Sequence, residues 1–201
     1  MSFEIDTKCV ILCEFWSDIM KFDLEFVNKG NYFNILNEWE IDPNVEQSPY
    51  YDGKSKRIVI LRKNPISDYF IESLTEIHHD GISSEKDKDR GHFIAQSFKE
   101  FLLTPDELSS FKNEVNIFFG RQNKANITPQ SPAANRNSKD LTGQAKFELQ
   151  ISDYLKKSSD GKVYFEIEEL TIDTIGLGRR IYIHWFNDEK CDSHIFIPDR
   201  R

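Results

Sequence analysis

Two short motifs contain the residues of this chain whose types and spacing are suited to chemistry. The first is Asp-Arg-Gly-His at positions 89–92. The second is Asn-Ile-Thr-Pro-Gln at positions 126–130, with Asn135 nine positions after Asn126. A neutral imidazole can take a proton from water near pH 7, and a guanidinium can donate two hydrogen bonds to phosphate oxygens. Amide oxygens can hold a hard divalent cation, which neutralises charge on a phosphate during in-line attack. Together the motifs supply the groups needed to cleave a phosphodiester bond.

In this order and with this spacing, the two motifs resemble the signature of the DNA/RNA non-specific endonucleases. That family belongs to the ββα-metal, or His-Me finger, nucleases. The resemblance extends from about residue 89 to the C-terminus and is weak before residue 80. It implies a metal-dependent endonuclease that hydrolyses DNA, RNA or both with little sequence preference. It also implies Mg²⁺ as the cofactor, with Mn²⁺ as the alternative ion.

The resemblance assigns roles to individual residues. His92 matches the general base of the family, and Asn135 matches its one direct protein ligand to the metal. Asn126 resembles the residue that holds the base in place. Glu148 resembles the helix acid that contacts metal-bound water, although it follows Asn135 at a longer distance than the family pattern; an insertion at 136–140 would explain the difference. Gly91 is expected to adopt a backbone conformation closed to other residues.

A second set of residues is expected to contact the substrate or to order the loops around it. Its members are Asp89, Arg90, Gln130 and Arg136. The two arginines could donate to phosphate oxygens, Arg90 as part of the catalytic group and Arg136 in substrate binding. Asp89 could accept a hydrogen bond from the imidazole or brace its loop. An arginine before the first motif often assists the transition state in the family; Arg57 or Arg62 could serve, and the sequence does not choose between them.

The formal net charge of −8 is unusual for a protein that binds a polyanion, but the charges are unevenly distributed. Residues 1–50 hold ten acidic side chains against three lysines, whereas residues 121–146 hold five basic side chains against Asp140 alone. The basic segment contains the second motif, so a local positive field around the site would suit a nucleic acid. The alternative is that these cations are merely solvated.

Hydrophobic patterning predicts an α+β fold over residues 1–201 as a single domain. Strands and a helix are expected in 1–80, and the family resemblance implies a ββα-metal core followed by strands in 81–201. Expected strands are 9–16, 22–27, 57–62, 162–171, 180–186 and 195–197. Expected helices are 66–77 with Ser67 as its cap, one that begins at Thr104, and 142–157 with Ala145, Leu149, Ile151 and Leu155 pointing inward. A central antiparallel sheet should carry the catalytic unit on one face, with residues 131–139 as a loop and 115–119 packed beneath the site.

Several classes of protein are disfavoured. No apolar run of 18 residues is present, which predicts no membrane span. The N-terminus lacks the basic start and apolar stretch of a signal peptide, which predicts a cytoplasmic protein or export by another route. Three cysteines, an odd number, disfavour a disulfide framework. A structural zinc site remains an alternative reading of Cys9, Cys13, Cys191 and His194.

The expected partner is DNA or RNA. The resemblance also allows an immunity or inhibitor protein, and a homodimer is left open. The biological role could be a toxin domain, a defence effector or a nutritional nuclease, and the missing signal peptide and the few cysteines disfavour the last. The alternative function is a catalytically inactive module on the nuclease fold that binds nucleic acid or protein, because a fold does not guarantee an activity.

Overall fold

The computed structural model describes residues 19–51, 55–75, 87–120, 123–139, 142–173, 175–186 and 192–199. Within these ranges seven strands form one antiparallel sheet in the order β1-β2-β9-β8-β7-β4-β3. They are β1 (Phe26–Asn28), β2 (Phe33–Ile35), β3 (Tyr50–Tyr51), β4 (Lys56–Arg62), β7 (Lys162–Ile172), β8 (Ile175–Trp185) and β9 (Ser193–Pro198). The strands β5 (Asp89–His92) and β6 (Ile127–Gln130) pair separately, as the β5–β6 ribbon. The predicted α+β fold with a central antiparallel sheet is confirmed.

Nine helices or short 3₁₀ turns connect these strands within the described part of the chain. They are the 3₁₀ turns η1 (Met20–Phe22), η2 (Pro43–Glu46) and η3 (Gln96–Phe98), and the helices α2 (Ile71–Leu74), α3 (Lys99–Leu102), α4 (Pro105–Ser110), α5 (Lys112–Phe118), α6 (Pro132–Asn135) and α7 (Gln144–Lys157). None of the described helices is long and apolar enough to cross a membrane.

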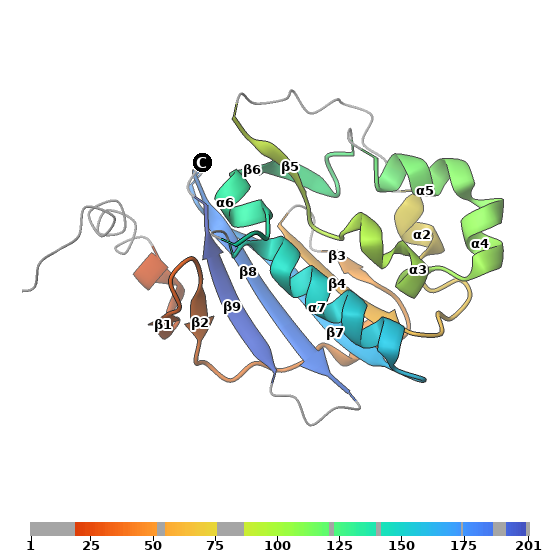
Figure 1. The fold of residues 1–201 in the computed structure, drawn as a ribbon, viewed down its shortest axis with the longest axis horizontal. Coiled ribbons are helices and arrows are strands. Elements are labelled where there is room, and N and C mark those ends of the chain that lie inside the picture. Colours follow the sequence, from red (N-terminus) through yellow and green to blue (C-terminus); the bar gives the residue numbers. More distant parts are fainter. Residues whose placement is uncertain are drawn as a thin grey trace, which may run out of the picture.

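Helix α7 covers one face of the large sheet, with α6 and the β5–β6 ribbon near its N-terminal end (Figure 1). Its buried face repeats every four residues, at Phe147, Ile151 and Leu155, as an amphipathic helix requires. The predicted bounds of this helix are close to the observed ones. The expectation that Leu149 points inward is wrong, because this register leaves Leu149 53% exposed.

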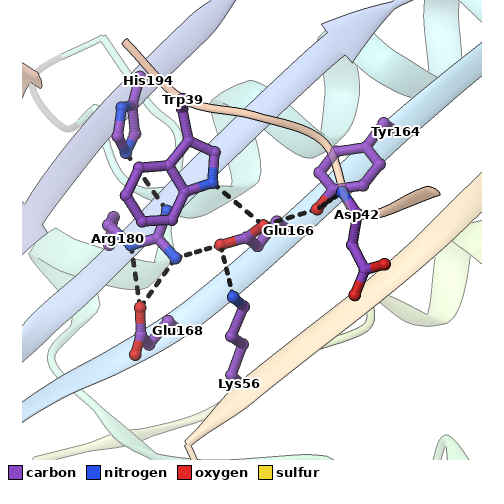
Figure 2. Close-up of polar contacts among 8 residues, drawn as sticks. All are labelled: Trp39, Asp42, Lys56, Tyr164, Glu166, Glu168, Arg180 and His194. Carbon is purple, nitrogen blue, oxygen red and sulfur yellow. Dashed lines mark hydrogen bonds and ion pairs between the residues drawn. The ribbon is translucent and has the colours of Figure 1, made fainter. Parts of the chain in front are cut away.

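The other face of the sheet carries a buried polar network (Figure 2). Glu166 and Arg180, each 1% exposed, form an ion pair, and Arg180 also donates to Glu168 at 2.8 Å. The ring of Trp39 lies 4.1 Å from the guanidinium carbon of Arg180, and its indole nitrogen donates to Glu166 at 3.3 Å. The network therefore fixes the segment around residue 39 against the sheet.

A second helical layer leads into the site. Thr104 and Glu107 form a capping box at the start of α4, as the Thr-Pro sequence predicts. The carboxylate of Glu107 also accepts from the main-chain nitrogen of Asp68 at 2.6 Å, and Asp68 has a left-handed φ of 64°. A left-handed residue cannot continue a helix, so the predicted helix 66–77 reduces, within the described residues, to the four residues of α2.

Other differences from the expected elements are local. The predicted strand 22–27 is replaced by η1 followed by the three residues of β1. The predicted loop 131–139 contains α6, which Ser131 caps and Pro132 begins. Residues 176–178, which separate the expected strands 162–171 and 180–186, belong to β8. The strand predicted at 9–16 lies outside the described residues.

Candidate active site

The β5–β6 ribbon brings the two sequence motifs side by side. Its antiparallel register pairs Asp89 with Gln130 at one end and His92 with Ile127 at the other. Arg90 pairs with Pro129 between them, and its side chain is partly buried. Because side chains alternate along a strand, Arg90 and His92 project from the same side of β5. The ribbon is therefore the element that positions both motifs.

The His92 imidazole is anchored at the end of α5. Its Nε2 lies 3.0 Å from the main-chain oxygen of Phe119, one of the terminal carbonyls that the helix itself leaves unpaired. A carbonyl can only accept, so Nε2 carries the proton. Burial lowers the pKa of His92, and the positive charge of Arg179 lowers it further, although the bond to Phe119 opposes them. No hydrogen bond to Nδ1 is made by the described residues, so the neutral ring presents Nδ1 as a proton acceptor.

Asn126 holds the chain that follows His92. Its side chain is fully buried, accepts from the main-chain nitrogen of Ile94 at 2.8 Å and donates to the oxygen of Ile94 at 3.0 Å. Its own main-chain oxygen accepts from Phe93 at 2.8 Å. This position favours a structural role next to His92 over direct contact with substrate.

Position 91 has no room for a side chain, because the side chain of Gln130 lies directly against it. A Cβ atom at this position would lie 2.2 Å from Oε1 and 2.8 Å from Cβ of Gln130. Gly91 is not among the residues with positive φ, so the expectation of a special backbone conformation is wrong. Gln130 is itself fully buried and donates to the oxygen of Ala134 at 3.4 Å. It therefore orders α6, and its burial does not support contact with substrate.

Asp89 joins the expected metal ligand to the ribbon. Its carboxylate accepts from Nδ2 of Asn135 at 3.1 Å and from two nitrogens of Arg136 at 2.7 and 2.6 Å. The hydrogen bonds from Arg136 are the largest of the effects that lower the pKa of Asp89. The amide nitrogen of Asn135 is thus engaged by Asp89, which leaves its oxygen available to a cation. Asp89 contacts neither His92 nitrogen in this arrangement, so it braces the loop.

The start of α6 is held by a residue near the C-terminus. Asp199, 5% exposed, accepts from the main-chain nitrogen of Ser131 at 3.0 and 3.2 Å. Lys88 lies 3.8 Å from the same carboxylate. Asp199, the residue after β9, therefore supports both the start of β5 and the helix that carries Asn135. No motif in the sequence marks this role of Asp199.

Glu148 lies on α7, where Gln144 donates to its Oε1 at 2.6 Å and to the oxygen of His92 at 2.7 Å. Burial raises the pKa of Glu148 to about 7, although Gln144 and the charge of Arg179 oppose the shift. Asn137 forms a β-bridge with Thr142, just before α7 begins. Gln144 thus links Glu148 to the end of β5 at His92.

Two buried arginines of the large sheet lie beneath the ribbon. Arg57 is 3% exposed and donates to the oxygen of Ala125 at 3.1 and 2.5 Å. Arg179, fully buried, donates to the oxygens of both Gly91 and His92. The position of Arg57 supports the ribbon and does not favour the expected contact with substrate. Arg179 was not found from the sequence, where it is one of two adjacent arginines in a largely apolar strand.

The alternative of a structural zinc site falls mainly outside the described residues, because Cys9, Cys13 and Cys191 are not among them. Within the described residues no group of three or more His, Cys, Asp or Glu side chains could hold a metal ion. His194 lies on the opposite face of the sheet, 3.3 Å from Arg180.

Comparison with known proteins places this arrangement among solved structures. No protein-family model matches the sequence, and no curated protein matches it. The structure is similar to NucA from Streptococcus agalactiae, solved with no metal bound, with a TM-score of 0.64 and 16% identity over 94% of this chain and 89% of NucA. A structure of Sda1 nuclease with a bound zinc ion aligns at a TM-score of 0.39 and 11% identity over 74% of this chain and 71% of that one. The likeness to NucA shows a shared fold, which is the fold that the sequence resemblance implied.

Proposed function

We propose that this protein is a metal-dependent endonuclease that hydrolyses phosphodiester bonds of DNA, RNA or both with little base preference. The observation that carries the proposal is the neutral His92 imidazole, held by Phe119 through Nε2 and open at Nδ1. The fold supports it, because the chain shares the fold of NucA, and this is the fold that the sequence resemblance implied. The site supports it as well, because both nuclease motifs meet in one ribbon.

His92 acts as the general base in this proposal. A base that works near pH 7 must be unprotonated there, and the lowered pKa of His92 satisfies this condition. The bond from Nε2 to Phe119 fixes both the tautomer and the direction of the ring. Nδ1 then takes a proton from the attacking water. Asn126 keeps the base in position, because its side chain binds the main-chain nitrogen and the main-chain oxygen of Ile94, two residues after His92.

Asn135 is the proposed protein ligand for a divalent cation. Its amide nitrogen is engaged by Asp89, so the carbonyl oxygen is the atom that a cation would meet. A single neutral oxygen ligand suits Mg²⁺, which keeps several waters and binds through few protein groups, and Mn²⁺ is the alternative. When bound, such a cation neutralises charge on the phosphate and the leaving oxygen. Glu148 on α7 would accept hydrogen bonds from water in the site once it is ionised.

Arg136 and Arg90 are the proposed contacts to phosphate. The side chain of Arg136 is 61% exposed, and its guanidinium donates two hydrogen bonds to the carboxylate oxygens of Asp89. Phosphate oxygens present the same geometry, so substrate can compete with Asp89 for this guanidinium. Arg90 projects from the same side of β5 as His92, where it can meet the same phosphate.

Metal-dependent cleavage tests the proposed function. Plasmid DNA and RNA are each incubated with the wild-type protein and Mg²⁺, Mn²⁺ or a chelator. Cleavage should require the cation, and Asn135→Ala should abolish it. Asn137→Ala, an exposed asparagine of the same loop, is the matched control and should cleave normally. Absence of cleavage by the wild type with every cation would favour the alternative of an inactive binding module.

The biological setting proposed for this activity is a toxin domain or a defence effector. A toxin that degrades nucleic acid harms the cell that contains it unless an immunity or inhibitor protein is present. Expression of the wild-type chain in an unprotected host should therefore stop growth, and expression of His92→Ala should not. Equal growth with both chains would contradict this setting while leaving the hydrolytic activity itself untouched.

A further inference from the structure

Arg179 holds the main chain on both sides of His92. Its Nη2 donates to the oxygen of Gly91 at 2.9 Å, and its Nη1 donates to the oxygen of His92 at 2.7 Å. The first oxygen belongs to the peptide group that precedes the Cα of His92, and the second to the group that follows it. Nη2 also donates to the hydroxyl of Thr128 on β6 at 2.8 Å. One buried guanidinium therefore fixes both peptide planes from which the imidazole projects and ties them to the partner strand.

The same guanidinium extends to α7. Nη1 of Arg179 donates to Oε1 of Gln144, whose Nε2 in turn donates to His92 and to Glu148. The guanidinium carbon also lies 4.5 Å from the centre of the Phe93 ring, the residue after His92. The strand that carries the base and the helix that carries the acid are thus joined through one side chain of β8.

We propose that Arg179 is a positioning residue for the hydrolytic site: it holds the main chain of His92 where the ring reaches Phe119, and it sets the distance of the ring from Glu148. The inference rests on the proposed function. Arginine is required because its planar fork offers five donors in fixed directions, whereas the ammonium of lysine is a single point with three rotating donors. A lysine at this position would keep the charge but could not reach all four acceptors at once.

Arg180 provides a matched control on the same strand. It is as buried as Arg179, but it points to the opposite face, where it binds Glu166 and Glu168 (Figure 2). Replacing it removes a buried arginine and its ion pairs without touching the β5–β6 ribbon. A loss of activity that comes only from weaker folding should therefore appear in both variants.

The experiment compares kcat and KM for plasmid cleavage by wild-type protein, Arg179→Lys and Arg180→Lys, each corrected for the folded fraction. Arg179→Lys should lower kcat by about 10²-fold with little change in KM, because small displacements of reacting groups have effects of this size. Arg180→Lys should lose stability and keep its kcat. Equal kcat values for Arg179→Lys and wild type, or equal losses in both variants, would overturn the inference.

A measurement without activity separates this inference from the proposed function. Nitrogen NMR of the His92 ring should show a single Nε2–H tautomer in wild type and Arg180→Lys, and a mixture in Arg179→Lys. If the wild type cleaves nothing, the proposed function fails, and an unchanged tautomer in Arg179→Lys overturns the positioning role separately. If Arg179→Lys does not fold, Gln144→Met, which cuts the link to Glu148, replaces it. A kcat and a tautomer unchanged from wild type in Gln144→Met would overturn the inference.

Discussion

Replacing Glu148 by Gln should stabilise the protein at alkaline pH and do much less at acid pH. Burial raises the pKa of Glu148 from 4.5 to about 7, so the folded state holds the ionised form poorly. Below pH 4.5 the carboxyl is neutral in the folded and unfolded states, and it costs nothing. As the pH rises through about 7 the folded state must accept the charge, and the cost becomes complete. The step from 4.5 to about 7 corresponds to about 3 kcal/mol of unfolding free energy.

Thermal unfolding in the presence of a chelator measures this difference. At about pH 8.5, Glu148→Gln should raise Tm by roughly 6–12 °C, because 1 kcal/mol shifts Tm by about 2–4 °C in a chain of this size. At about pH 5 the gain should shrink to about a quarter of that. The amide keeps an acceptor for Gln144, so the hydrogen bond of 2.6 Å is retained. Asp153→Asn, an exposed acid of the same helix, is the control and should change Tm little at either pH.

Two results would refute the reasoning about Glu148. A gain of the same size at both pH values would mean that the variant acts through packing. No gain at alkaline pH would mean that the carboxylate is well solvated in the folded protein. The predicted result would mark Glu148 as an acid retained at a cost in stability, which is typical of functional positions.

Three further predictions concern the ribbon and its base. Asn126→Ala should lower the unfolding free energy by about 3 kcal/mol, since two buried main-chain groups lose their partner; urea unfolding that shows no loss would contradict this. Gly91→Ala should cost about 1–3 kcal/mol through its clash with Gln130, and Gln130→Gly should recover part of that cost in the double variant; additive losses would contradict the clash. In Glu148→Gln, the cleavage rate measured against pH should fall on the acid side as His92 becomes protonated. Because the pKa of His92 is lowered, the midpoint of that fall should lie below pH 6.5. A midpoint above pH 6.5 would contradict the assignment of His92 as the base.

Local signals in the sequence predicted those parts of the fold that local physics determines. The Thr-Pro start of α4 depends on contacts within its own first turn, and the regular apolar spacing of α7 and β7 marks the side chains that face the core. The helix expected from residue 66 failed because a distant carboxylate, that of Glu107, binds the main chain there. Apolar spacing alone does not contain that information.

The candidate site also contains residues that the sequence could indicate and residues that it could not. His92 and Asn135 follow from motif order, and the structure attaches both to one strand, His92 directly and Asn135 through Asp89. The supporting residues Arg179 and Asp199 could not be predicted, because each is a single polar residue whose partners lie far away in the sequence. Alternation along a strand gives the face of such a residue, and it does not reveal which distant carbonyl or amide that face meets.

The central claim is that His92 removes a proton from water during phosphodiester cleavage, and one comparison tests it most directly. Mg²⁺-dependent cleavage of DNA and RNA is measured for wild-type protein, His92→Ala and His184→Ala, with folding checked for each. His184 is a control of the same residue type on the far face of the sheet, bonded to Asp192 at 2.9 Å. The account predicts a loss of about 10²–10⁴-fold for His92→Ala and near-normal cleavage for His184→Ala. Near-native cleavage by folded His92→Ala would contradict it.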